Sequence, residues 1–114
     1  MGVSDTYELI INIVDRDRSE VVMDAAKKAG ATGGTVVHGR GAGPDDTQKV
    51  FKIAVQPEKE LVLILALKED KHAIMQAICD HMYEEVGRHI VSFSVPADDV
   101  TGLFRREVPS VPEE

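Results

Sequence analysis

A glycine-rich window from Gly30 to Gly43 holds the residues best suited to contact a ligand. It reads GATGGTVVHGRGAG and contains six of the nine glycines of this 114-residue chain. Glycine allows close approach to the backbone, so successive amides of such a loop can surround an anion. The alternative is a flexible connection that starts with a helix cap at Gly30. The position of the window between two expected strands favours an anion site.

Basic side chains near this window would complete such a site. The guanidinium of arginine presents five donors in a planar fork that fits phosphate. We therefore predict an anion held between the 39–43 loop and a turn at 87–89. The alternative for both arginines is a solvated surface charge. The predicted ligand-binding residues are Gly39, Arg40, Gly41, Gly43, Arg88 and His89.

Other candidates for chemistry are weaker. His38 precedes the loop and is either a packed side chain or a pH-sensitive contact. His72, Gln76 and Cys79 share one helical face, but no second cysteine or nearby carboxylate completes a soft-metal site. No serine or cysteine nucleophile has a base at a suitable spacing. We predict no catalytic residue, no metal site and no enzymatic activity.

Composition narrows the class of protein. The formal charge of −7 and the 4% aromatic content, with no tryptophan, argue against a nucleic-acid surface. The single cysteine, Cys79, is typical of a reducing compartment. No apolar run reaches the length of a membrane span, and the first residues lack a signal-peptide pattern. We expect a cytoplasmic protein that neither binds nucleic acid nor inserts into a membrane.

Hydrophobic periodicity predicts four strands, one further extended arm and two helices. Asp17 and Glu20 have capping-box spacing at the start of the first helix, which Gly30 ends. Gly87 ends the second helix, and Pro96 closes the last strand. The expected elements are a strand at 7–14, a helix to about residue 29, a strand at 35–39, a strand or arm at 49–56, a strand at 61–67, a helix at 71–86 and a strand at 90–95.

This β-α-β-β-α-β order predicts an α+β, ferredoxin-like fold: a four-stranded antiparallel sheet with two helices on one face. The run LVLILAL at 61–67 is apolar on both faces of its strand. Because the helices cover one face, the other must pack against further copies of the chain. We assign residues 1–104 to one domain and residues 105–114, with two prolines, to a flexible C-terminal tail.

The element order and the Gly30–Gly43 window resemble those of the PII-type nitrogen regulatory proteins. A second landmark is the segment from Ser94 to Val100, in which a proline is followed by paired acids and a valine. The resemblance implies a homotrimer with inward-facing sheets and adenine nucleotide (ATP, ADP or AMP) bound between subunits. It also implies that a loop, here about 39–58, signals to a membrane transporter or a metabolic enzyme.

The chain departs from the family pattern in its loops. The signalling loop is short and lacks the tyrosine that undergoes uridylylation, and Glu58 replaces a lysine. The Gly-Asp-Gly-Lys phosphate loop is replaced by Gly87-Arg88-His89, and Arg105 and Arg106 are out of phase with two phosphate-binding arginines. The ligand is therefore an adenine nucleotide or another small anionic metabolite. The alternative is a metal-responsive trimer of the divalent-cation-tolerance type, which has the same fold.

Overall fold

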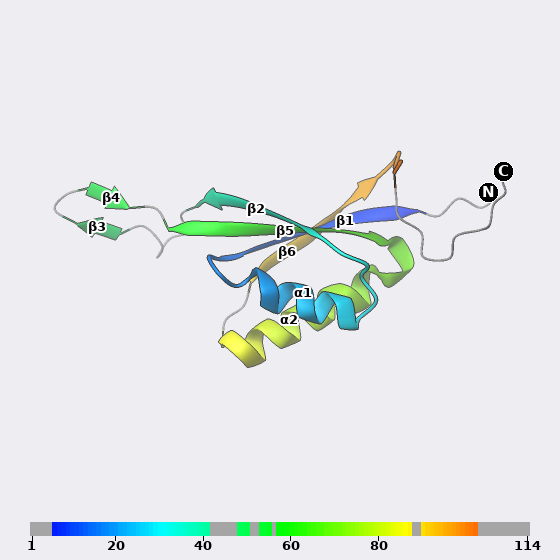
Figure 1. Ribbon diagram of the computed structural model, residues 1–114, viewed down its shortest axis with the longest axis horizontal. Coiled ribbons are helices and arrows are strands. Elements are labelled where there is room, and N and C mark those ends of the chain that lie inside the picture. Colours follow the sequence, from blue (N-terminus) through cyan, green and yellow to red (C-terminus); the bar gives the residue numbers. More distant parts are fainter. Residues whose placement is uncertain (1–5, 42–47, 51–52, 56, 88–89, 103–114) are drawn as a thin grey trace.

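The fold is described from a computed structural model, which covers residues 6–41, 48–50, 53–55, 57–87 and 90–102. Figure 1 shows one sheet with both helices against the same face and a small hairpin beyond one end. The elements are β1 (Tyr7–Asp15), α1 (Ser19–Lys28), β2 (Thr35–Arg40), β3 (Gln48–Val50), β4 (Ile53–Val55), β5 (Glu58–Leu67), a 3-10 turn (Lys68–Asp70), α2 (Lys71–Val86) and β6 (Val91–Ala97).

The predicted ferredoxin-like order is confirmed. The main sheet has the strand order β2-β5-β1-β6, and every neighbouring pair is antiparallel. The predicted single strand or arm at 49–56 is wrong, because β3 and β4 pair with each other as a separate hairpin. Alternation of side chains does not show where a strand reverses direction, so the pattern alone could not separate the two.

Alternation along the central strands places the core between the sheet and the helices. In β1 and β5 every second residue is buried, and these residues face α1 and α2. On α2 the buried stripe is Ile74, Ile78 and Met82. The core side chains are Ile10, Val14, Val22, Ala25, Ala26, Val62, Ile64, Ala66, Ile74, Ile78 and Met82.

The opposite face of the sheet is apolar and bears no helix (Figure 1). The intervening residues of β1 and β5, such as Ile11 and Leu63, are only half-buried there. On β6, Val91, Phe93 and Val95 are 59%, 43% and 39% exposed. The prediction that the run at 61–67 is apolar on both faces is confirmed. We call this surface the open face.

The predicted helix ends are confirmed at the C-termini. Gly30, at φ 114°, donates its N–H to the Lys27 carbonyl at 3.1 Å, and the Ala31 N–H reaches the Ala26 carbonyl at 2.9 Å. This is a Schellman motif. Gly87, at φ 76°, ends α2 and donates to the Tyr83 carbonyl at 2.8 Å.

Two predicted boundaries are wrong. The capping box does not form, because Arg18 is the N-cap residue of α1 and provides no side-chain hydrogen bond. Pro96 does not close the last strand, which continues through Ala97 with Pro96 opposite Glu8. Since β6 is an edge strand, a residue without an N–H is tolerated there.

The predicted tail, 105–114, lies outside the described residues. No described helix combines the length and apolar character needed to cross a bilayer.

Close packing between the 30–34 segment and β5 gives a first prediction. A Cβ on Gly34 would lie 2.8 Å from the Met23 sulfur and 3.0 Å from the Leu63 carbonyl oxygen, whereas one on Gly33 would meet nothing within 4 Å. We expect Gly34→Ala to lower the free energy of unfolding by about 1–3 kcal/mol, as overpacking does. Gly33→Ala, the matched control, is expected to change it much less. Urea denaturation of both variants measures the difference, and equal effects would contradict the packing argument.

Candidate functional site

The structure places part of the predicted anion site in a strand rather than a loop. Gly39 and Arg40 belong to β2, opposite Lys59 and Glu58 of β5. The Gly41 N–H then donates to the Pro57 carbonyl at 3.3 Å. The loop therefore begins later than predicted, because β5 starts three residues before its apolar run and extends the ladder. Gly43, Arg88 and His89 lie outside the described residues.

Arg40 differs from the other basic groups near it. Arg16 pairs with Glu58 at 3.2 Å and Asp17 at 3.7 Å, and Lys59 lies 2.7 Å from an Asp15 oxygen. Arg40 is exposed, and no hydrogen bond or ion pair with another described residue engages its guanidinium. An anion at the base of the loop would therefore meet a guanidinium that no other described residue engages.

Arg40 and Val91, the residue that follows the predicted turn and its neighbour Ile90, lie at the same end of the sheet but on opposite edge strands. Arg40 ends β2, whereas the turn before β6 leads into Val91. Strands β5 and β1 lie between these two edge strands. Three strand spacings separate the edges by about 14 Å. Gly39 and Arg40 of one chain are therefore too far from the turn before β6 of the same chain to hold one small anion with it. The turn of another copy of the chain would be needed.

A buried carboxylate next to β2 is the main feature that the sequence reasoning missed. Glu60 is 4% exposed and accepts the Ser19 N–H at 3.2 Å. It also accepts the Asp17 N–H and the Ser19 hydroxyl, and the His38 Nδ1 lies 3.7 Å from its second oxygen. Glu60 thus caps α1 from β5 in place of the expected capping box. The turn that brings these donors together holds Asp17 at φ 71°, a conformation few non-glycine residues adopt.

These contacts set the ionisation of Glu60. Burial acts to raise its pKa, but the hydrogen bonds from Asp17 and Ser19, together with the charge of His38, lower that pKa below the ordinary 4.5. The carboxylate is therefore charged near neutral pH and faces the positive end of the α1 dipole. The side chain of His38 is 76% exposed beside it, so it is not a packed side chain.

The alternation of β5 carried a signal for this cap. Glu60 occupies the same face as the buried Val62 and Ile64, so its carboxylate had to point toward the helices. The sequence analysis started this strand at Leu61 and so did not include that position.

The metal candidate of His72, Gln76 and Cys79 is not supported by the contacts of Gln76. Its Nε2 donates to Asp80 Oδ1 at 2.9 Å. Within the part of the chain that is described, no three His, Cys, Asp or Glu side chains gather as metal ligands would.

Comparison with known proteins identifies the family. The family model for nitrogen regulatory protein P-II matches residues 7–107, which is nearly the whole chain. The chain belongs to the P-II family. Proteins of this family are regulatory by description, and the predicted resemblance is confirmed. No protein of curated function matches the chain.

Two solved structures have a similar fold. One is a Bacillus cereus protein related to NIF3, with 16% identity and a TM-score of 0.61 over 83% of this chain. The P-II chain spans only 26% of that protein's length. The other is an Arabidopsis thaliana PII bound to citrate, with 22% identity and a TM-score of 0.63 over 88% of this chain and 85% of that one. At these identities, both similarities concern the fold.

The Glu60 cap yields a prediction for acid stability. Since the pKa is lowered in the folded state, the stabilisation is fully present above the ordinary 4.5 and is lost as the pH falls through the folded value. Glu60→Gln should cost about 1–3 kcal/mol at pH 7 and weaken the decline of stability below about pH 4.5. Urea denaturation between pH 3 and pH 7 measures both effects.

The control for this experiment is Glu58→Gln. Glu58 has the same charge two residues earlier, but its side chain is 51% exposed and pairs with Arg16 on the surface. Its loss should cost no more than about 1 kcal/mol. A larger effect at Glu58 than at Glu60 would be incompatible with a buried helix cap at Glu60.

Proposed function

We propose that this P-II family member is a signal-transduction protein that works as a homotrimer. It senses a small anionic metabolite or an adenine nucleotide between subunits and regulates a membrane transporter or a metabolic enzyme through its 39–58 loop. The observation that carries this proposal is the exposed Arg40 at the base of the loop, which no other described residue engages and which lies on the edge strand opposite β6. Two copies of the chain would bring those parts together.

The open face supports assembly. Its central residues, such as Ile11 and Leu63, are half-buried within one chain, and Phe93 and Val95 at one margin are 43% and 39% exposed. Soluble proteins rarely leave a continuous apolar surface of this kind in water. Packing of open faces around a common axis would cover it, as the family resemblance implies.

We propose two classes of ligand. An adenine nucleotide, ATP, ADP or AMP, follows from the family resemblance, with phosphate facing Arg40 and the 87–90 turn. The second class is a carboxylate metabolite, since the structurally similar Arabidopsis PII was solved bound to citrate. Both are anions that a guanidinium can hold by charge-assisted hydrogen bonds.

The hairpin of β3 and β4 supports signalling to a partner. It lies between β2 and β5 in the chain and pairs only with itself, outside the main sheet (Figure 1). A ligand at Arg40 would bind where the chain leaves β2 toward this hairpin. We propose that the regulated partner, a transporter or an enzyme, binds the β3–β4 hairpin. We also propose that the protein is cytoplasmic, as its single cysteine suggests.

Assembly is tested by mass in solution. Light scattering of the full chain at micromolar concentration should give three copies of 12.5 kDa. Phe93→Asp should dissociate the trimer without unfolding the chain, because the side chain is already 43% exposed in one copy. Ala73→Asp, on the exposed part of α2, is the control and should stay trimeric. A monomeric wild-type protein would contradict the proposal.

Ligand binding is tested by calorimetry with ATP, ADP, AMP and citrate. Arg40→Ala should weaken the best ligand by about 1.5–3 kcal/mol, the range for a hydrogen bond to a charged group. Arg16→Ala removes the same charge from an arginine that is already paired with Glu58, and is expected to have little effect. Equal losses in the two variants would indicate general electrostatic attraction, and no loss at Arg40 would remove it from the site.

A further inference from the structure

A second candidate site lies at the other end of β5. A pocket of about 150 Å³ opens there, between the segment that follows α1 and the start of α2. Arg40 pairs with Glu58 at the first residue of β5, whereas the pocket is lined by its last three. At about 3.3 Å per residue the two sites are about 25–30 Å apart. The pocket is therefore distinct from the anion site proposed above.

The pocket exists because β2 is shorter than β5. The pairing of β2 with β5 starts with Thr35 opposite Leu63, whereas β1 pairs with β5 as far as Leu67. Residues 30–34 pass beside the last part of β5 without forming a strand. One edge of β5 is therefore left without a neighbouring strand for its last four residues.

The register shows which backbone groups face this gap. The bond from the Gly41 N–H to the Pro57 carbonyl joins two directly opposed residues, so the odd-numbered residues of β5 turn their N–H and C=O groups toward β2. By the same alternation, Leu65 and Leu67 turn theirs into the gap. No backbone hydrogen bond recorded among the described residues occupies them on that side. The pocket thus offers backbone acceptors and donors that no strand uses.

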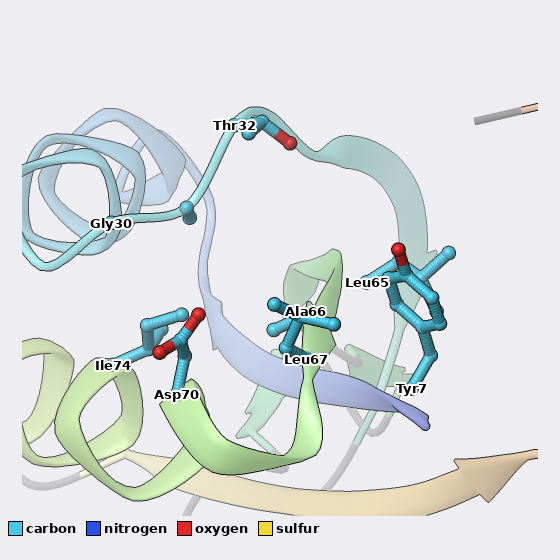
Figure 2. A pocket seen from close by; sticks show the side chains of 9 residues that line it. Tyr7, Gly30, Thr32, Leu65, Ala66, Leu67, Asp70 and Ile74 are labelled. Atoms are coloured by element: carbon cyan, nitrogen blue, oxygen red, sulfur yellow. The ribbon is translucent and has the colours of Figure 1, made fainter. Parts of the chain in front are cut away.

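The side chains add apolar walls and one negative charge. In Figure 2, Asp70 and Ile74 lie on one side, Tyr7 and Leu65 on the other, and Ala66 and Leu67 between them. The Asp70 carboxylate points toward the space, although Asp70 is the N-cap residue of α2 and could have capped it. No hydrogen bond or ion pair with another described residue engages this carboxylate. Thr32 contributes a hydroxyl above the pocket.

The charged side chain that lines the pocket is acidic. No lysine or arginine lines it. Lys71, the nearest cation along α2, is paired with the buried carboxylate of Glu8 at 3.1 Å. The C-terminus of α1, which carries the negative end of the helix dipole, closes another side at Gly30. Asp70 is therefore the one charged side chain among the described residues of the lining, although it also lies at the positive end of the α2 dipole.

We propose that this pocket binds a small organic cation, a primary ammonium group on a short apolar chain. The ammonium group pairs with the Asp70 carboxylate, and the Leu65 and Leu67 carbonyls are further acceptors beside it. The alkyl chain lies against Ala66 and Ile74. The volume suits a ligand about the size of benzene, since cavities of about 150 Å³ hold a molecule of that size.

The test uses n-butylammonium as the probe and the full-length wild-type protein. Amide NMR spectra should show saturable shifts at residues 30–32 and 65–70. Two compounds of the same length, neutral 1-butanol and anionic butyrate, should bind about tenfold more weakly or worse, because they cannot pair with Asp70. Wild-type shifts confined to other residues, or equal binding of 1-butanol, would overturn the proposal.

Two variants isolate the carboxylate. Asp70→Asn keeps the shape and the N-cap preference of the residue, so the fold is retained, and it should weaken n-butylammonium binding about tenfold or more. Glu69→Gln removes the same charge from the neighbouring exposed residue, which does not line the pocket, and should leave affinity within about twofold. If both variants lose affinity equally, recognition comes from surface charge and the assignment to this pocket is wrong. Neither result depends on Arg40, which lies at the other end of β5.

Discussion

The nine-residue antiparallel pairing of β1 with β5 is the constraint on which the rest of the structure depends. It aligns Tyr7 with Leu67 and Asp15 with Lys59 and so fixes the face of every side chain between them. One set meets α1 and α2, and the other forms the open face. A shift by one residue would exchange these sets and bury the wrong side chains. The open face is apolar along both strands, and neither helix covers it (Figure 1).

Polar groups on the helix side tie the layers together at defined points. Glu60 on β5 holds the start of α1, and Glu8 on β1 pairs with Lys71 at the start of α2. Between them, Asn12 donates to the Val62 carbonyl and accepts the Ser92 hydroxyl. Burying a polar group costs free energy unless the group is hydrogen-bonded. Any other position of the helix or strand would break one of these bonds and would therefore be less stable. These bonds position the helices more specifically than apolar packing does.

The unequal lengths of β2 and β5 relate the two proposed sites. At one end, the ladder runs through Gly41 and delivers Arg40 and the loop to a single edge of the sheet. At the other end, β2 has not yet begun, and the free edge of β5 forms one wall of the Asp70 pocket. The anion proposal needs a second copy of the chain, whereas the lining of the pocket comes from residues of one copy. Cation and anion sites on opposite ends of the same strand would allow the two ligands to act separately.

The sequence by itself determined the order of the elements of the main sheet and its helices, the ends of both helices at Gly30 and Gly87, and the two apolar faces of the run at 61–67. These follow from local backbone preferences and from periodicity, which one segment expresses without its neighbours. Only the tertiary structure decided where α1 is capped, because the cap comes from Glu60, forty-one residues after Ser19. It also decided that Gly39 and Arg40 are strand residues and that Asp70 faces a pocket. These features depend on how far the ladder between β2 and β5 extends, and pairing between distant strands cannot be read from either strand alone.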